Sequence, residues 1–178
     1  MLRNDTTRFG LVSRLIHWAM AVLIISLLIL GTELSRLQPG LANLWLYGLH
    51  KTMGLTAFAL VLARLIWHRI SPPPAPIGPP KAWETRAAKT VHRLTYALLV
   101  LIPLAGWVYA SATGLDVMFA DRWVVPPIAP VSEAWENAAY LAHKILTKVL
   151  IGVLALHVLG ALRRAFAGDG TMERMIGG

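Results

Sequence analysis

Residues 141–162 read LAHKILTKVLIGVLALHVLGAL, a long apolar stretch that contains two histidines, His143 and His157. In an α-helix, a separation of fourteen residues falls about 40° short of four full turns, so both rings project from nearly the same face. The same separation corresponds to a rise of roughly 21 Å, about two-thirds of the hydrocarbon thickness of a bilayer. If this stretch crosses a membrane, it presents one imidazole near each surface. That geometry is suited to holding two metal centres stacked across the membrane.

Three further stretches are apolar and long enough to accompany this one across a membrane. The chain has 178 residues, of which 56% are hydrophobic and 15% are charged, whereas soluble domains carry about one quarter charged residues. We therefore predict an all-α integral membrane protein. Its whole length is expected to form a single membrane domain, a four-transmembrane-helix bundle with helices over about 14–34, 44–67, 90–112 and 141–162.

The ends of the first and fourth helices carry local signals. No small-residue cleavage pattern follows the first apolar stretch, so we expect a retained helix rather than a signal peptide. Ser132 is expected to be the N-cap of a fourth helix that begins before the membrane, with Glu133 and Glu136 in its first turn.

The distribution of charge predicts the orientation of the bundle. Twelve of the 17 basic residues lie in or beside the segments that share a side with both termini, and five lie on the other side. The acidic residues divide nearly evenly. The positive-inside rule then places both termini and the second connection in the cytoplasm. The membrane topology accounts for the distribution of the net charge of +8. We therefore expect lipid rather than nucleic acid to be the partner of this protein.

The second connection contains a proline-rich run. Residues 71–80 read SPPPAPIGPP, which predicts a stiff spacer of the polyproline type on the cytoplasmic side.

Four histidines form one pair at each membrane depth. His17 lies near the cytoplasmic end of the first span and is matched by His157, whereas His50 lies near the periplasmic end of the second span and is matched by His143. An ionisable residue at membrane depth is costly and suggests function, and neutral imidazole is a common axial ligand of haem iron. A hydrogen-bonded packing residue is the alternative for any single one of them. A packing role explains less well than metal ligation why four histidines are matched in depth.

The absence of cysteine narrows the choice of metal centre. The sequence contains no cysteine, which excludes disulfides, thiolate-ligated zinc, iron–sulfur clusters and covalently attached c-type haem. Any metal centre must therefore use histidine, methionine or carboxylate ligands.

Several arginines lie on the faces that carry these histidines. Arg64 follows His50 by fourteen residues, so it leaves the second helix on nearly the same face and at the depth of the cytoplasmic pair. An arginine there needs an anion, and a haem propionate is a suitable bidentate partner. Arg14 and Arg164 are similarly placed on ligand-bearing faces. For all three, the alternative is ordinary snorkelling of a basic side chain toward the cytoplasm.

The remaining histidines and three lysines leave more than one interpretation open. His92 opens the third helix and is expected to contact a haem propionate or a quinone, to replace one cytoplasmic ligand, or to cap the interface; His68 is expected to be interfacial. Lys51, Lys144 and Lys148 lie near the periplasmic histidines. They are expected to bind the propionates of an outer haem, to form a positive funnel for a small anionic electron donor, or to be plain interfacial lysines.

Four sequence motifs resemble the bacterial cytochrome b561 family, and the resemblance covers nearly the whole chain. They are the His–Trp pair at 17–18, LHKTMG at 49–54, HRLTYALLVLIPLAGW at 92–107 and AHK…LH at 142–157. The resemblance implies two b-type haems in the bundle interior, each held by two histidines: His17 and His157 on the cytoplasmic side, His50 and His143 on the periplasmic side. It also implies a multi-pass protein of the bacterial inner membrane that exchanges electrons with ubiquinone or another quinone.

From these observations we expect an electron-transferring oxidoreductase that carries single electrons across the inner membrane. A small periplasmic reductant would donate at the lysines, and superoxide is a candidate because it is small, anionic and a one-electron donor. The alternative is a membrane-anchor cytochrome subunit of a larger hydrogenase- or formate-dehydrogenase-like complex, with a redox partner subunit. The chain ends soon after its fourth span, which favours the stand-alone form, alone or as a homo-oligomer. A proton or metal transporter would need carboxylates at mid-membrane depth, where the spans carry none.

Overall fold

Four long helices dominate the computed structural model, which describes residues 1–77 and 81–177. Each is long and apolar enough to cross a membrane, which confirms the predicted four-helix membrane fold. Residues 78–80 of the predicted proline-rich spacer lie outside the described residues. The elements are α1 (Leu11–Leu34), α2 (Leu44–Ile70), α3 (Ala82–Ala112), β1 (Val117–Phe119), β2 (Trp123–Val125), α4 (Glu133–Phe166) and α5 (Glu173–Ile176).

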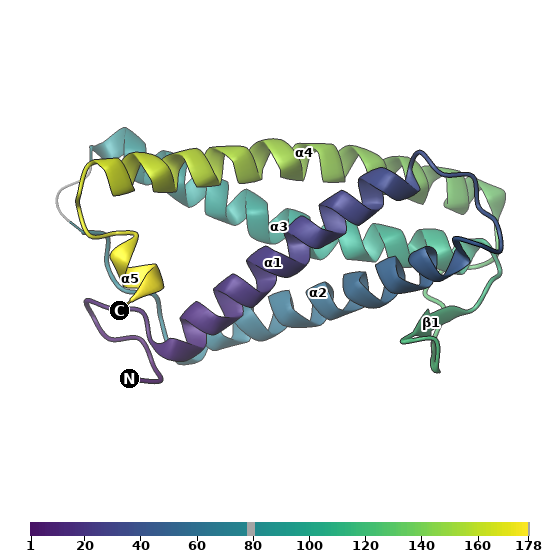
Figure 1. The fold of residues 1–178 in the computed structure, drawn as a ribbon, viewed down its shortest axis with the longest axis horizontal. Helices are drawn as coiled ribbons and strands as arrows, with labels where there is room; N and C mark the ends of the chain where they lie inside the picture. The colour runs from purple at the N-terminus through teal and green to yellow at the C-terminus, as the bar shows by residue number, and fades with distance from the viewer. Residues whose placement is uncertain (78–80, 178) are drawn as a thin grey trace.

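The four long helices pack in chain order. α1 packs against α2, α2 against α3, and α3 along α4. α1 runs diagonally across the bundle (Figure 1), and within the described residues its backbone makes few or no close approaches to that of α4. The hydrophobic core lies midway along the helices and consists of Met20, Val61, Leu98, Leu99, Leu150 and Val153.

α3 and α4 are longer than the segments predicted from hydropathy. α3 begins at Ala82 rather than near residue 90, and α4 runs from Glu133 to Phe166. Its 34 residues extend about 51 Å, well beyond the hydrocarbon core. Hydropathy marks only the part of a helix in lipid, whereas residues 82–89 (AWETRAAK) continue the helix in water because most of them are good helix formers. Outside the apolar segments, Arg163 of α4 and Glu84 of α3 form an ion pair at 2.8 Å.

α4 begins at the residue that the sequence predicts, but the predicted capping hydrogen bond is not formed. Ser132 is the N-cap residue, as predicted, and Glu133 and Glu136 lie in the first turn, but the serine side chain makes no capping hydrogen bond. The two carboxylates still favour this helix end through its dipole.

A small antiparallel hairpin was not predicted from the sequence. β1 and β2 pair with Val117 opposite Val125, Met118 opposite Val124, and Phe119 opposite Trp123. Three-residue strands are too short to show the alternating pattern by which strands are recognised. The hairpin therefore adds a minor sheet to an otherwise helical fold.

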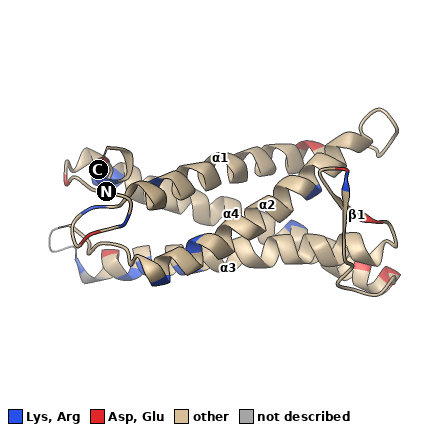
Figure 2. Cartoon of the chain, turned by 90° about the horizontal axis from the view of Figure 1, so that it is seen from below, with Lys and Arg blue, Asp and Glu red and all other residues tan. Residues whose placement is uncertain are grey.

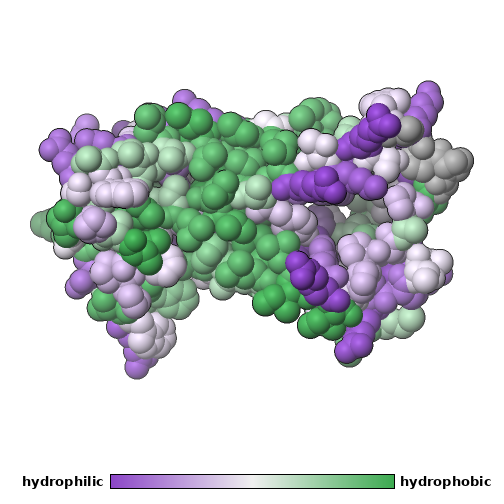
Figure 3. Space-filling view, turned by 180° about the vertical axis from the view of Figure 1, so that it is seen from behind, coloured by the Kyte–Doolittle hydropathy of each residue, from purple (hydrophilic) through white to green (hydrophobic). Residues whose placement is uncertain are grey.

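Both termini lie at the same end of the bundle (Figure 1). Lysine and arginine gather mainly at that end (Figure 2), and an apolar band separates the two polar ends of the molecule (Figure 3). The terminal segments are fixed there by hydrogen bonds: the backbone N–H of Asn4 donates to Ser71 Oγ at 2.8 Å, and Trp18 Nε1 donates to the Met175 carbonyl at 2.9 Å. Which end faces the cytoplasm stays a prediction from the charge distribution.

Candidate metal centres

The structure brings the histidines together in the two predicted pairs. At the inner site, on the side of the termini, His17 of α1 and His157 of α4 have ring centroids 6.3 Å apart and ring planes inclined by 38°. At the outer site, His50 of α2 and His143 of α4 have ring centroids 6.2 Å apart and ring planes inclined by 77°. In both cases the rings extend between helices that pack mainly against other neighbours.

These distances fit one metal ion between the two rings of each pair. Imidazole nitrogen binds transition-metal ions at about 2.0–2.1 Å, so rings on opposite sides of one ion have centroids roughly 6 Å apart. In the described part of the chain, no group of three or more His, Cys, Asp or Glu side chains could hold a metal ion. Each pair offers two imidazoles, a donor set that fits the axial ligation of a b-type haem.

The ring of His143 is held in an orientation suited to ligation. Its Nδ1 lies 2.9 Å from the carbonyl oxygen of Ile102 in α3. When Nδ1 donates to this carbonyl, the lone pair of Nε2 is free for a metal. The rings of His17 and His50 differ, because their Nδ1 atoms are buried and have no hydrogen-bond partner within the described structure.

Two glycines allow helices to approach the outer histidines. A Cβ atom added to Gly31 of α1 would lie 3.2 Å from Cε1 of His50. One added to Gly106 of α3 would lie 3.1 Å from Nδ1 of His143. Both distances are tighter than ordinary van der Waals contact. The lack of a side chain at these positions therefore makes room for the two rings.

One spacing relates the two sites on all four helices. Each helix contributes one residue to the inner site and one to the outer site, fourteen positions apart in every case. Because fourteen residues nearly complete four turns, both residues lie on the inward face. The pairs are His17 and Gly31 on α1, Arg64 and His50 on α2, His92 and Gly106 on α3, and His157 and His143 on α4. The histidines and Arg64 predict this spacing on α2 and α4, whereas on α1 and α3 the partner is a glycine, which carries no chemical signal of its own.

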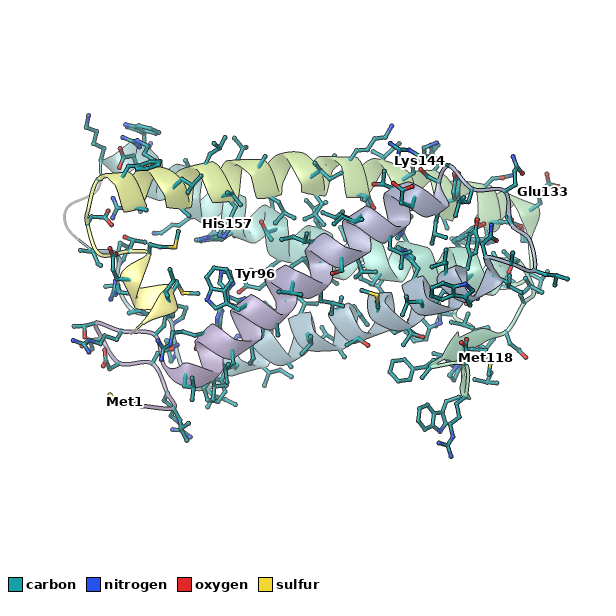
Figure 4. All side chains as sticks on the ribbon, in the orientation of Figure 1. Met1, Tyr96, Met118, Glu133, Lys144 and His157 are labelled. Atoms are coloured by element: carbon teal, nitrogen blue, oxygen red, sulfur yellow. The ribbon has the colours of Figure 1, made fainter. Side chains whose placement is uncertain are left out.

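Arg64 lies at the inner site, as predicted. Its charge acts on the rings of His17, His92 and His157, and its guanidinium carbon lies 6.0 Å from the ring centroid of Tyr96. Tyr96 and His157 lie at the same level of the bundle (Figure 4). The Arg64 Nε is buried without a hydrogen-bond partner in the described structure. A buried cationic donor of this kind fits an anionic group such as a haem propionate.

The other histidines and Arg14, which the sequence places at this end, have different surroundings from those of Arg64. The ring of His92 lies 5.3 Å from that of His157, so it belongs to the inner site. Arg14 also has a buried Nε without a partner, while its Nη1 donates to the Ile176 carbonyl at 3.2 Å. His68, expected to be interfacial, has its Nδ1 3.4 Å from the hydroxyl of Tyr96. Nothing in the sequence pattern singles out this tyrosine.

The sequence predicts a cofactor contact for Arg164, whereas in the structure Arg164 contacts other residues of the chain. It donates to the Ile77 carbonyl at 2.9 Å and forms ion pairs with Asp169 and Glu84. Burial raises the pKa of the Asp169 carboxyl, but hydrogen bonds from Thr171 and the charge of Arg164 outweigh that effect and hold this pKa below its usual value. These contacts fix the segment after α4 to the proline-rich connection.

Lys51 and Lys144 are the sequence neighbours of the outer histidines, whereas Lys148 lies five residues beyond His143, about 7 Å toward the middle of α4. Lys144 and Lys148 are exposed and Lys51 is half-buried. Lys144 is labelled near the end opposite the termini (Figure 4), and its Nζ lies 5.7 Å from the ring centroid of Tyr140. Lys51 and Lys144 thus lie at the level of the outer histidine pair, and the role of the three lysines stays a prediction.

Comparison with known proteins finds similarity to cytochrome b561 proteins over most of the chain. A family model described as prokaryotic cytochrome b561 matches residues 8–178. Cytochrome b561 homolog 2 of Escherichia coli (strain K12) is 27% identical over 178 residues, covering 98% of this chain and 94% of the relative. Cytochrome b561 homolog 1 of the same organism is 27% identical over 146 residues, covering 75% and 82%. A protein of Yersinia pestis named probable superoxide oxidase CybB is 23% identical over 162 residues, covering 90% and 91%.

Proposed function

The chain belongs to the prokaryotic cytochrome b561 family, and we propose that it carries single electrons across the inner membrane on two b-type haems and delivers them to quinone. The family and the four membrane helices make it a multi-pass inner-membrane electron carrier that uses b-type haem. The proposal rests on two pairs of imidazole rings that lie at two depths in the bundle. The ring centroids are 6.3 Å apart in the inner pair and 6.2 Å apart in the outer pair. A haem with two imidazole ligands has no open coordination position and supplies reversible one-electron transfer.

The residues of each site have distinct roles in this proposal. His17 and His157 hold the inner haem, and His50 and His143 hold the outer one. The hydrogen bond from His143 to the Ile102 carbonyl fixes the outer ring and raises its basicity as a ligand. At the inner site, the guanidinium of Arg64 compensates the charge of a propionate.

We propose a small anion as the electron donor on the periplasmic side, with superoxide as the specific candidate. Lys51 and Lys144 follow the outer histidines directly in sequence and Lys148 lies one turn beyond, so the three would place positive charge beside the outer pair and raise the local concentration of an anionic donor there. The name of the Yersinia pestis relative supports superoxide. Two superoxide anions would each lose one electron to become dioxygen, while one quinone gains two electrons and two protons to become quinol.

The quinone is proposed to exchange electrons at the inner site. His92 and Tyr96 lie there beside Arg64 and carry groups that can hydrogen-bond a quinone oxygen. Protons for the quinol would come from the cytoplasmic side, which is the nearer surface.

Quinone reduction in proteoliposomes tests the donor. The rate of quinol formation under a superoxide source is compared between the native chain and a Lys51→Gln/Lys144→Gln/Lys148→Gln variant. We expect a several-fold lower rate and a weaker dependence on ionic strength in the variant. Lys81→Gln, an exposed lysine at the opposite end, is the matched control and should leave the rate unchanged. A native protein that chemical reductants reduce but superoxide does not would contradict the proposed donor and leave the haem assignment standing.

A further inference from the structure

The β1–β2 hairpin packs on the outward side of α2. The backbone N–H of Ala120 donates to Oγ1 of Thr52 at 2.9 Å, and the carboxylate of Asp121 lies against Gly48, 2.7 Å from the position that a Cβ would take. Gly48 and Thr52 are one helical turn apart on the same face. His50 lies between them in sequence and projects from the opposite face, into the bundle. The hairpin is therefore outside the bundle, below α2 in Figure 1.

Placed in a bilayer that α2 crosses, the hairpin would lie at the depth where headgroups meet acyl chains. Gly48 and Thr52 follow the start of α2 at Leu44 by four and eight residues, which is about 6 and 12 Å along the helix. The 27 residues of α2 measure about 40 Å, close to the thickness of a bilayer with its headgroups. The turn of the hairpin thus reaches past the polar surface toward the hydrocarbon boundary.

The side chains of the hairpin have the composition of a membrane-interface segment. Trp123 is 54% exposed and Val124 is 59% exposed. The ring of Phe119 lies 6.1 Å from that of Trp123, and the guanidinium of Arg122 lies 5.2 Å from the Trp123 ring centroid. Tryptophan with a neighbouring cation is favoured at the level of lipid headgroups, where the indole is half in apolar surroundings and the cation meets phosphate.

The backbone at the turn is suited to this environment. Ala120 and Asp121 both have positive φ, 53° and 51°, as in the turn types that join tight hairpins. The Arg122 N–H donates to the Phe119 carbonyl at 3.2 Å, and the Ala120 N–H is bonded to Thr52. A backbone that enters a membrane interface needs its polar groups satisfied in this way.

We propose that this hairpin is an interfacial anchor that inserts Trp123, Val124 and Met118 into the leaflet opposite the termini. Lipid is the occupant because the hairpin continues the apolar surface of α2 at the same depth, and because Arg122 offers a charge complementary to lipid phosphate. A second copy of the chain covering the same surface is the competing occupant.

Spin labelling of single cysteines tests the anchor, because the chain contains no cysteine of its own. The full-length protein is prepared as Val124→Cys and, independently, as Met118→Cys, labelled with a nitroxide and reconstituted in vesicles of phosphatidylethanolamine and phosphatidylglycerol. Collision with dioxygen and with a water-soluble nickel complex reports depth. Leu41→Cys, at a side chain 96% exposed in the connection between α1 and α2, is the aqueous control, and Ile25→Cys within α1 is the lipid control.

We expect both hairpin labels to show an oxygen-to-nickel accessibility ratio several-fold above that of Leu41→Cys and approaching that of Ile25→Cys. A ratio equal to the Leu41→Cys value would overturn the proposal. Dipolar broadening that disappears on dilution with unlabelled protein would also overturn it, because a second copy would then cover the hairpin.

Discussion

Single residues at the outer site differ in how firmly their rings are held. His143 is fixed by the Ile102 carbonyl, whereas Nδ1 of His50 has no partner within the described structure. Gly106 and Gly31 contact these two rings almost equally closely. The same added methyl group should therefore have unequal effects at the two glycines.

Gly106→Ala is expected to disturb the outer haem more than Gly31→Ala. The new Cβ would press on a ring that a hydrogen bond holds in place, while the ring of His50 can yield by a few tenths of an ångström. Haem content and the optical spectrum of the purified variants measure the effect. Gly152→Ala, where a Cβ meets nothing within 4 Å, is the control and should keep the native spectrum. Equal losses in the Gly106 and Gly31 variants would contradict the explanation.

Arg64→Gln is expected to lower the midpoint potential of one haem by an amount on the order of tens of millivolts. A nearby positive charge stabilises the reduced state of the iron, so its removal favours the oxidised state. A spectroscopic redox titration should show one midpoint shifted and the other unchanged. Arg69→Gln, five residues further along α2 and exposed, should shift neither. If both variants shift the same midpoint equally, the inner placement of Arg64 is wrong.

The histidines could be predicted because their chemistry is unusual at membrane depth and their spacing is regular. The roles of Gly31 and Gly106 could not be predicted, because glycine is common in membrane helices. Only the positions of His50 and His143 in the structure show that these glycines make room for the two rings. The fourteen-residue spacing from His17 would have identified Gly31. The contacts of Arg164 depend on how the residues after α4 fold back, which no helical periodicity encodes.

At the level of elements, hydropathy locates the membrane part of each helix and misses the parts in water. α3 and α4 continue beyond the lipid because their flanking residues retain helix propensity and are joined by the Glu84–Arg163 ion pair. The hairpin is different in kind. Its short strands leave no periodic signal, and its turn places alanine and aspartate in a conformation typical of glycine.

Ala120→Gly is expected to stabilise the turn by roughly 1 kcal/mol, because a left-handed backbone is costly for alanine and not for glycine. Slower hydrogen exchange of the Arg122 amide, which closes the turn, measures the gain. Ala120→Val is the matched variant and should accelerate that exchange. The positive φ would not be a source of strain if the glycine variant exchanged faster than the native chain.

At the level of the whole molecule, charge and fold agree on which parts share an end. Both termini, α5 and most basic residues lie together at one end (Figures 1 and 2), whereas Lys144 lies toward the other end (Figure 4). The inner and outer sites are separated by the hydrophobic core, in which all four long helices meet. The molecule thus has two sites in series along its length.

The orientation predicts which surface positions a membrane-impermeant thiol reagent reaches in intact cells. Leu41→Cys should be labelled once the outer membrane is permeable to the reagent, and Ala167→Cys should be labelled only after the inner membrane is opened. Both residues are exposed, so access to the reagent depends on the side of the membrane. The reverse labelling pattern would show that the orientation is opposite to the predicted one and that the lysines face the cytoplasm.

The central claim is that α4 provides one ligand to each of two haems. Haem per chain, measured as the pyridine haemochrome of purified protein, tests it most directly in His50→Ala, His157→Ala and the double variant, with His68→Ala as control. We predict two haems in the native chain and the control, one in each single variant, and none in the double variant. Two haems retained in either single variant, or a native chain with fewer than two, would contradict the claim.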